Sequence, residues 1–389
     1  MTQASHPPHS HESILHGGPL FNWLSKIGMT FSSGRTKWLM AAYAAATYGV
    51  MLILTIAQGT YINSSLKLPF AIDVGEACRF LLCGPLLIAA EPVIEPWLRN
   101  VVEQFRTLTS DLDKPKLDAF VATAKRMRDL WWVEMLIIMF ALARPHLDPS
   151  IAFEHEVSNW QVVNGQTSWA ELYCDFVAKP LMGCLWLRWL WKYLVWSYLQ
   201  IKIATLDLKL IPTHPDDMAG LGFVGIGQEK FSVLVLAIAV LVASHDADEI
   251  LYEGLSFLSQ EWIILFVMIL AAVIFLTPLL AFTPKLVECK RRGLFEYGKL
   301  AQEYVTAFDE KWIENRHDIG KHEALGQADV SSLADMEAAY NIVQRMKIFL
   351  VDRTLLTTFA LSVMLPFAPL ALTMVSFQEI INHMLKNFV

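Results

Sequence analysis

The chain has 389 residues, of which 54% are hydrophobic and 18% are Asp, Glu, Lys or Arg. Soluble domains carry about 25% charged residues, so this composition argues against a soluble protein and favours a membrane protein. The formal net charge of -7 and the lack of a dominant basic face argue against binding to nucleic acid.

Apolar stretches long enough to cross a bilayer, which needs about 20 residues, recur along the whole chain. They are residues 38–58, 74–94, 130–147, 172–197, 231–250, 262–283 and 354–375. We therefore predict an all-α polytopic membrane protein with about seven transmembrane helices. A polar, His-rich N-terminal tail (1–36) precedes the membrane domain (37–376), and an amphipathic tail (377–389) follows it.

The distribution of Lys and Arg predicts the orientation of these helices. The N-terminal tail and the connections at 95–129, 201–230 and 284–353 contain 24 Lys and Arg residues, whereas the alternate connections and the C-terminal tail contain two. Positive residues stay on the cytoplasmic side. We expect a bacterial inner-membrane protein with a cytoplasmic N-terminus and a periplasmic C-terminus.

Two of the cytoplasmic connections have helical periodicity. Segments 97–128 and 285–350 carry apolar stripes on otherwise charged helices, which predicts a cytoplasmic helical layer. Asp113 precedes Lys114 and Pro115, a pattern typical of a helix start. Ser332 with Asp335 resembles a capping box and predicts that another helix begins there.

Charged residues inside the predicted spans are the first candidates for function, because each costs about 2.5–3.5 kcal/mol at the bilayer centre. They form an outer set (Glu76, Arg79, Arg144, Asp175, Lys179) and an inner set (Glu91, Glu95, Glu134, Arg188, Lys192). At 100° per residue, Lys179 lies 40° from Asp175, so these two side chains share one helix face. The sets are either a polar pathway among the second, third and fourth spans or structural ion pairs.

The last predicted span contains Pro366 and Pro369, about one turn apart. Proline removes a backbone donor and bends a helix, so we expect a kink near the middle of this span. Such a bend is a candidate gate and is also a common feature of ordinary spans.

A distinctive loop lies between the fourth and fifth spans. It contains His214, Pro215, Asp216 and Asp217, followed by a Gly-Leu-Gly-Phe element that begins at Gly220 and includes Gly222. Proline, aspartate and glycine all favour turns, so a rigid turn before a helix is one interpretation. The alternative is a functional His214–Asp216 pair that binds a proton or contributes half of a metal site.

With these residues, the chain resembles a group of uncharacterised bacterial multi-pass inner-membrane proteins that carry an HPD tripeptide followed by a Gly-Leu-Gly-Phe element. The resemblance covers this loop and the general hydropathy pattern. It implies a multi-pass membrane fold and no particular activity.

Three functional hypotheses follow. The first is an oligomeric channel or transporter for a small ion or solute, and the second is a membrane sensor or scaffold that binds a cytoplasmic protein. The third is a membrane enzyme that uses the HPD loop. We predict no catalytic residues and no cofactor, because the sequence lacks G-x-S-x-G, H-E-x-x-H, C-x-x-C and P-loop motifs. The expected partners are the bilayer and a second copy of the chain.

Overall fold

The computed structural model describes residues 17–18, 33–147, 159–163, 165–248, 250, 261–314 and 328–374. Most of the predicted N-terminal tail and all of the predicted C-terminal tail lie outside this part of the chain. So does the side chain of Arg144.

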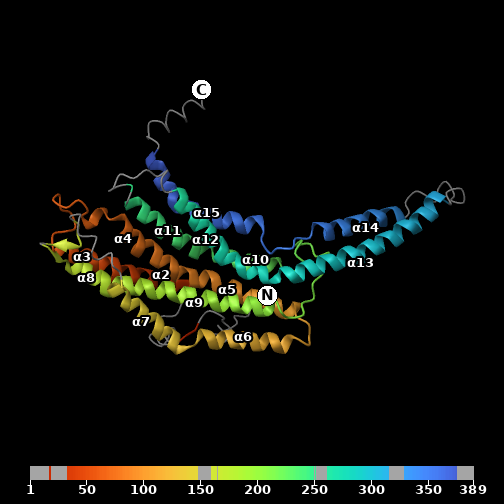
Figure 1. The fold of residues 1–389 in the computed structure, drawn as a ribbon, viewed down its shortest axis with the longest axis horizontal. Helices are drawn as coiled ribbons and strands as arrows, with labels where there is room; N and C mark the ends of the chain where they lie inside the picture. The colour runs from red at the N-terminus through yellow and green to blue at the C-terminus, as the bar shows by residue number, and fades with distance from the viewer. Residues whose placement is uncertain are drawn as a thin grey trace, which may run out of the picture.

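The described residues form an elongated helical bundle with one helical hairpin extending from it (Figure 1). The elements are α2 (Ser33–Ala44), α3 (Val50–Ala57), α4 (Val74–Cys78), α5 (Gly84–Leu108), α6 (Lys114–Arg128), α7 (Trp131–Leu147), β1 (Val162–Val163), β2 (Gln166–Thr167), α8 (Trp169–Tyr173), α9 (Lys179–Ile203), α10 (Gly222–Glu229), α11 (Ser232–Asp248), α12 (Glu261–Leu276), α13 (Thr283–Asp309), α14 (Ala328–Arg345) and α15 (Arg353–Met374). The prediction of an all-α fold is confirmed, with one short antiparallel hairpin, β1–β2, among the described residues.

Five continuous helices are long and apolar enough to cross a membrane. They are Arg35–Ala57, Val74–Leu108, Gly222–Ala247, Trp262–Glu314 and Arg353–Leu370. Helices also lie at the two other predicted ranges, as α7 and as the run from α8 to α9. The sequence therefore predicted correctly where helices lie and that several are suited to a bilayer.

Helices α5 and α9 lie side by side in the centre of the bundle and run parallel. The Trp189 indole N–H donates to the carbonyl oxygen of Leu87 over 2.8 Å. Farther along both helices, the Lys192 ammonium lies 2.5 Å from a Glu91 carboxylate oxygen. Because the contact positions advance together along both helices, the chain must reverse direction between α5 and α9.

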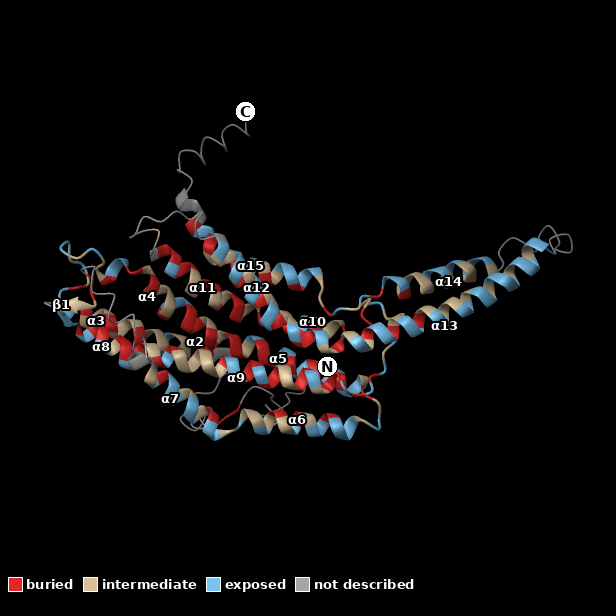
Figure 2. Ribbon diagram, viewed as in Figure 1, coloured by how far each residue is buried: buried red, intermediate tan, exposed pale blue. Residues whose placement is uncertain are grey.

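The return path is made by α6 and α7, which pack against successive parts of α9. The Trp191 indole donates to the carbonyl oxygen of Met127, close to the end of α6. Ala141 of α7 lies against Gly183 of α9, where a Cβ would contact the Ala141 Cβ at 3.5 Å. Buried residues are frequent on α5, α9 and α11 (Figure 2).

Helices α13 and α14 form a hairpin that extends beyond the bundle (Figure 1). Its far end is joined by the Lys311–Asp329 ion pair, 2.5 Å long, and by the Trp312 indole N–H, which donates to the same carboxylate over 3.1 Å. Helix α14 begins at Ala328, so the prediction that Ser332 opens this helix is wrong. The turn before the serine is held by Asp329, whose carboxylate is bound by Lys311 and Trp312 and whose carbonyl oxygen accepts from the Tyr304 hydroxyl over 2.9 Å.

The predicted helix start at Asp113 is correct in position, because α6 begins at Lys114 with Asp113 as the preceding residue. Its side chain makes no capping bond within the helix. Instead, Asp113 accepts a hydrogen bond from the backbone N–H of Asp207 over 2.8 Å and pairs with Lys116 at 2.7 Å. This carboxylate thus ties the start of α6 to the segment that follows α9.

We predict that Gly84→Ala destabilises the protein by about 1–3 kcal/mol, the usual cost of overpacking. A Cβ at Gly84 would lie 2.1 Å from the Tyr43 ring, so α2 and α5 would have to separate. Thermal unfolding of the purified protein in detergent measures the effect. Gly49→Ala is the matched control, because its Cβ would meet no heavy atom closer than 3.8 Å. Equal midpoints for the two variants would contradict the close α2–α5 contact.

Candidate functional site

Several of the predicted outer charges lie in one cluster at the first turns of α4–α5 and α8–α9. Arg79 forms an ion pair with Glu76. Lys179 pairs with Asp175 at 2.7 Å, as their shared helix face predicted. The Cys174 thiol, 3.9 Å from the second Glu76 oxygen, connects the two pairs. Together with Glu171 and Asp73, which are described next, we call this group the outer cluster.

Two further carboxylates belong to the outer cluster and escaped the sequence prediction. Glu171 lies 3.0 Å from Lys179, so this ammonium serves two carboxylates. Asp73 accepts hydrogen bonds from the backbone N–H of Glu76 and from the Trp160 indole, each over 2.8 Å.

A sequence signal for both carboxylates was present. Ser168 caps α8 by accepting the backbone N–H of Glu171 over 3.0 Å, and Asp73 caps α4 in the same way through Glu76. In each case a capping residue precedes a glutamate by three positions, which is the pattern of a helix N-terminus. This spacing places Glu76 in the first turn of the helical run that carries Arg79. It places Glu171 in the first turn of the run that carries Lys179.

The described outer cluster has more negative than positive groups. Its carboxylates are Asp73, Glu76, Glu171 and Asp175, and its cations are Arg79 and Lys179. One oxygen of Glu171, Oε2, is buried and has no hydrogen-bond partner among the described residues. A buried acceptor without a donor is unusual in folded proteins.

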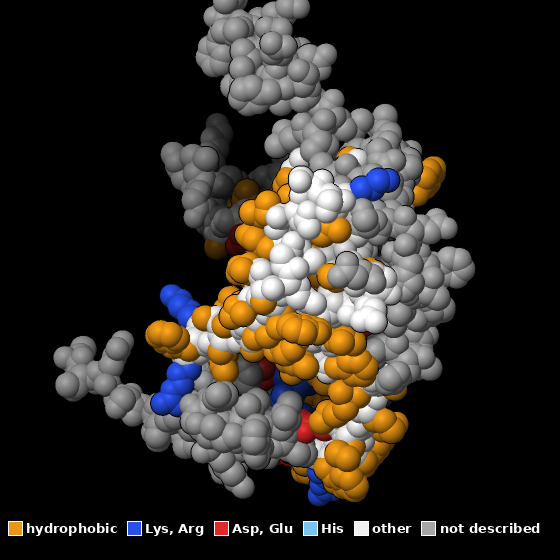
Figure 3. Space-filling view, turned by 90° about the vertical axis from the view of Figure 1, so that its left-hand side faces the viewer, with side chains coloured by type: hydrophobic (Ala, Val, Ile, Leu, Met, Phe, Trp, Pro, Cys, Tyr) orange, Lys and Arg blue, Asp and Glu red, His pale blue; other side chains and the backbone are white. Residues whose placement is uncertain are grey.

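Three π-helical turns surround the outer cluster. They are Ala45–Gly49, Arg79–Cys83 and Cys174–Ala178, and they lie in three adjacent helical runs. A π turn inserts one residue into an α-helix and occurs frequently at functional sites. The end of the molecule near this cluster presents mainly hydrophobic and uncharged side chains, with few Lys or Arg (Figure 3).

A small cavity of about 160 Å³ opens beside the two cations. It is lined by Arg79, Lys179, Met182, Trp186 and Leu241. The Trp186 indole nitrogen is buried and interacts with the side chain of Cys83. The cavity is therefore lined by two cations that are paired with carboxylates and by apolar groups, whereas none of those carboxylates lines it.

The inner set contains one fully buried ion pair. The side chains of Lys192 and Glu91 are 3% and 7% exposed, and the ammonium also lies 5.1 Å from the Trp189 ring centroid. Glu95, one turn beyond Glu91, is buried as well. Such a pair holds helices in register, because removing one partner leaves a buried charge.

The remaining predicted residues are more dispersed. Arg188 donates to the carbonyl oxygen of Gly17 over 3.2 Å, and Glu134 lies close to Gly18. Helix α15 continues through Pro366 and Pro369, whose side chains are half-buried and exposed. A gating role for these prolines stays a prediction.

A buried glutamine that the sequence did not single out joins three helices. Gln228 of α10 donates to the Phe275 carbonyl oxygen over 2.6 Å and to the Tyr193 hydroxyl over 3.2 Å. Its own carbonyl oxygen accepts from Trp196 over 3.3 Å and from Gln200 over 3.2 Å. The buried amide is therefore fully hydrogen-bonded and acts as a structural node.

The HPD loop forms a tight turn before α10. The Asp216 carboxylate accepts backbone hydrogen bonds from Met218 (2.8 Å), Gly220 (3.1 Å) and Gly222 (2.8 Å). Asp217 and Ala219 both have φ near 55°, which is uncommon for residues with a Cβ, and Gly220 has φ of 92°. The rigid-turn interpretation of this motif is thus supported by its own hydrogen bonds.

His214 lies against the same carboxylate. Its Nδ1 is 2.8 Å from an Asp216 oxygen and 3.3 Å from the Asp216 backbone nitrogen. With a proton on Nδ1 the ring donates to the carboxylate, and without one it accepts the backbone N–H. Within the described residues no group of three or more His, Cys, Asp or Glu side chains is placed to hold a metal ion.

The pKa of Asp216 lies below its ordinary value. Burial opposes ionisation of this carboxyl, but the three backbone N–H donors and His214 together outweigh that effect. The carboxylate is therefore a stable acceptor for the turn, and its lone pairs are engaged. This makes it a poor general base.

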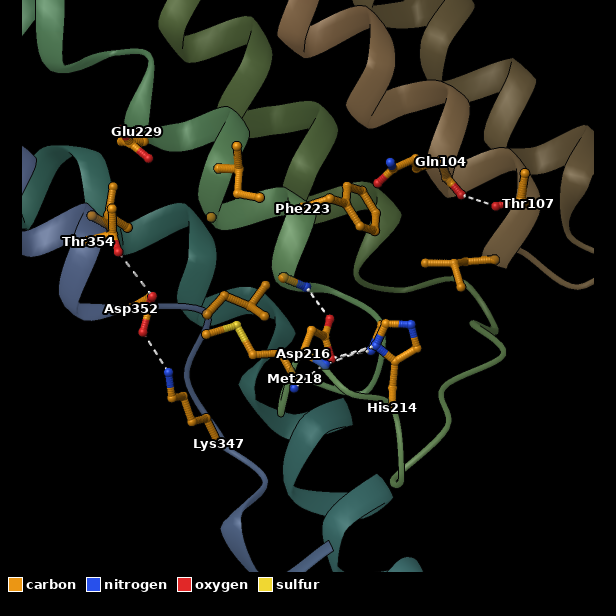
Figure 4. A pocket seen from close by; sticks show the side chains of 17 residues that line it. Gln104, Thr107, His214, Asp216, Met218, Phe223, Glu229, Lys347, Asp352 and Thr354 are labelled. Carbon is orange, nitrogen blue, oxygen red and sulfur yellow. Dashed lines mark hydrogen bonds and ion pairs between the residues drawn. The ribbon is translucent and has the colours of Figure 1, made fainter. Parts of the chain in front are cut away.

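A cavity of about 860 Å³ lies above the HPD loop, between α5, α10 and α15 (Figure 4). Its lining residues are Gln104, Thr107, Leu108, His214, Asp216, Met218, Gly220, Gly222, Phe223, Gly225, Ile226, Glu229, Lys347, Leu350, Asp352, Thr354 and Leu355. The Lys347 ammonium pairs with Asp352 at 2.6 Å, and its backbone N–H donates to the Asp217 carbonyl oxygen over 2.7 Å. The segment between α14 and α15 thus closes one side of this cavity.

No protein-family model, curated protein or solved structure matches the chain.

We predict that Lys192→Met destabilises the protein by about 3–5 kcal/mol, because it leaves the Glu91 carboxylate buried without its cation. The double variant Glu91→Leu/Lys192→Met removes both charges and should recover most of that loss. Thermal unfolding in detergent compares the two variants with the unmodified protein. A double variant no more stable than Lys192→Met would show that the pair is not the relevant interaction.

We also predict that Asp216→Ala loosens the HPD turn by about 1–3 kcal/mol, the cost of leaving backbone donors unsatisfied. Hydrogen exchange of residues 217–222, corrected for intrinsic rates, measures the local opening free energy. Asp111→Ala, at an exposed carboxylate, is the control.

The pH dependence of this turn follows from the depressed Asp216 pKa. Its stabilising contribution is complete above the ordinary Asp pKa of about 3.9 and is lost as the pH falls through the lower folded value. Protection that already falls between about pH 7 and pH 5 would contradict this assignment.

Proposed function

We propose that this chain is a seven-span membrane transport protein for a small ion, with the outer cluster as its binding site. The parallel arrangement of α5 and α9 supports the span count, because a chain that crosses a bilayer twice in one direction has to return between the crossings. Helix α7 is the element available for that return. The run from α8 to α9 carries five Asp, Lys and Arg side chains, so its hydropathy alone does not identify it as a membrane span.

Exposed tryptophans support a bilayer position. Trp131, Trp169 and Trp262 lie at the starts of α7, α8 and α12, and with Trp38 and Trp97 they are all exposed. Tryptophan is enriched at both membrane interfaces. At 1.5 Å per residue, the stretch from Val74 to Trp97 measures about 35 Å, which matches a hydrocarbon core of about 30 Å with its borders.

The observation that carries the transport proposal is the charge imbalance of the outer cluster. The described carboxylates outnumber the cations at the starts of the helical runs α4–α5 and α8–α9, two apolar elements of the bundle. An uncompensated carboxylate in a bilayer is costly unless a proton or another cation binds, and intramembrane carboxylates commonly mark ion pathways. The partnerless Glu171 oxygen is the place where we propose that this cation binds.

The inner Lys192–Glu91 pair fits the role of a closed barrier in this proposal. It lies between the outer cluster and the cavity above the HPD loop, and it is buried. A cation that crosses the protein has to pass this level, so the pair must open during transport. With Lys and Arg concentrated at the HPD side, we propose that this side and the N-terminus are cytoplasmic in a bacterial inner membrane.

The α13–α14 hairpin favours a second candidate, a sensor or scaffold. It extends beyond the bundle and exposes Phe295 and Ile313 on its outer surface. A partner protein on the cytoplasmic side, or a second copy of the chain, would have access to these side chains. The enzyme hypothesis gains less support, because the Asp216 carboxylate is occupied by backbone donors.

We predict that the full-length protein in liposomes conducts protons or alkali cations, and that Glu171→Gln lowers this flux at least about tenfold by removing the excess carboxylate charge. Flux is followed with an internal pH dye and by isotope uptake between about pH 5 and pH 8. The matched control is Glu103→Gln, at an exposed carboxylate on α5. No flux of protons, sodium or potassium anywhere in this range would contradict the proposal and favour the scaffold.

A further inference from the structure

The two oxygens of the Glu171 carboxylate have different surroundings. Its Oε1 lies 3.0 Å from the Lys179 ammonium, whereas its Oε2 is buried without a hydrogen-bond partner in the part of the chain that the structure describes. Because Oε2 is not exposed, solvent does not replace the missing donor. Buried polar atoms normally have a hydrogen-bond partner, since burial removes their hydration. Oε2 therefore has an open position for one hydrogen atom.

The charges around Lys179 are not balanced. Glu171 and Asp175 share this one ammonium, at 3.0 Å and 2.7 Å. The other cation of the outer cluster, Arg79, pairs with Glu76. When two carboxylates share one site, their repulsion favours a proton on one of them. Asp175 has the shorter contact with Lys179 and Glu171 has the open oxygen, so the geometry favours Glu171 as the carboxyl that takes the proton.

Few titratable groups act on Glu171. Lys179 and Asp175 lie on its own helical run, and Glu76 of α4 acts on it electrostatically. The buried Cys174 thiol is near both glutamates, because each acts on it electrostatically and its sulfur is 3.9 Å from the second Glu76 oxygen. Helix α3, which packs against α8, has no titratable side chain. Apart from one ammonium, the charged groups around Glu171 are thus negative, and a bound proton reduces their repulsion.

A metal ion fits this site poorly. Metal cations bind through several ligand atoms at once, and calcium takes about 6–8 oxygens. Among the described residues, no group of three or more His, Cys, Asp or Glu side chains is placed to hold a metal ion. The Lys179 ammonium also repels any cation that approaches the Glu171 carboxylate. A proton needs only one lone pair and no coordination shell.

We propose that the outer cluster binds one proton, on Oε2 of Glu171, and excludes alkali and divalent cations. The carboxylate takes the proton from water and becomes a neutral carboxylic acid. The group formed by Glu171, Asp175 and Lys179 then has no net charge. This inference names the small ion of the transport proposal. That the proton crosses the membrane rests on the function proposed above, whereas its binding does not.

The test is an infrared titration of the full-length protein in phosphatidylcholine nanodiscs. A protonated carboxyl has a carbonyl stretching band that a carboxylate lacks, and this band shifts in heavy water. We expect the band at about pH 6 and its loss by about pH 9, since carboxyls buried without donors release their protons at higher pH than exposed ones. Glutamate labelled with a heavy carbon isotope at its carboxyl group should shift the band, which assigns it to glutamate in the unmodified chain.

Variants assign the band to one residue. Glu171→Gln should abolish it, because the amide has nearly the same size and no titrating proton. Two matched variants keep Glu171. Glu103→Gln changes an exposed carboxylate on α5, and Asp246→Asn changes a buried carboxyl on α11. Both should retain the band at full intensity.

Competition with metal ions tests the selectivity on the unmodified chain. Sodium, potassium or calcium chloride should leave the midpoint of the titration unchanged, because these ions do not compete with the proton for Glu171. N-methylglucamine chloride keeps the ionic strength constant, since salt alone screens charges.

Four results would overturn the inference. They are the absence of a titrating carboxyl band in the unmodified protein, a band that Glu171→Gln leaves unchanged, a band that is lost in Asp246→Asn, and a midpoint that falls when one of the metal ions is added.

The liposome measurement separates this inference from the transport proposal. Flux of sodium or potassium without the carboxyl band contradicts proton binding and leaves transport supported. The band without any ion flux contradicts transport and leaves proton binding supported. Proton flux together with the band supports both.

Discussion

The structure depends on the compensation of charges that lie between apolar helices. Helix α9 carries Lys179, Arg188 and Lys192, and an uncompensated cation at bilayer depth costs about 2.5–3.5 kcal/mol. Glu91 of α5 neutralises Lys192, while Asp175 and Glu171 neutralise Lys179 from the same helical run. The Glu91–Lys192 pair fixes the register of α9 against α5, and the other helices pack around this parallel pair.

The same constraint explains why the two ends of the parallel pair differ. At the level of Lys192, one cation meets one carboxylate in a buried contact, which suits a structural role. At the outer cluster, the described carboxylates are in excess, three π turns lie in the adjacent helical runs, and a cavity lies beside the cations. Binding is therefore proposed where compensation is incomplete, and rigidity is expected where it is complete.

The sequence predicted the positions of the helices well, because apolar length is a strong signal at bilayer depth. It also predicted the Asp175–Lys179 pair, since a spacing of four residues is a local property of one helix. It did not predict the partner of Lys192, because the choice between Glu91 and Glu95 depends on how two helices are rotated. The π turns were not predictable from a periodicity of 100° per residue, which they interrupt.

Other omissions have physical reasons as well. Glu171 and Asp73 lie at or before the first helical turns, outside the apolar windows in which intramembrane charges were sought, although their capping spacing was visible. Gln228 gave no signal, because its role depends on three helices meeting at one amide. The HPD turn was predictable because its hydrogen bonds are local. The large cavity above it was not, since α5 and α15 come from distant parts of the chain.

The register of α5 against α9 can be tested directly by cysteine cross-linking in native membranes. In a chain whose five cysteines are replaced, Glu91→Cys combined with Lys192→Cys should cross-link rapidly with a short bifunctional reagent. Glu91→Cys combined with Leu190→Cys should not, because Leu190 is 52% exposed on another face of α9. Cross-linking of the 91/190 pair in preference to the 91/192 pair would contradict the charge-compensated pairing on which the account rests.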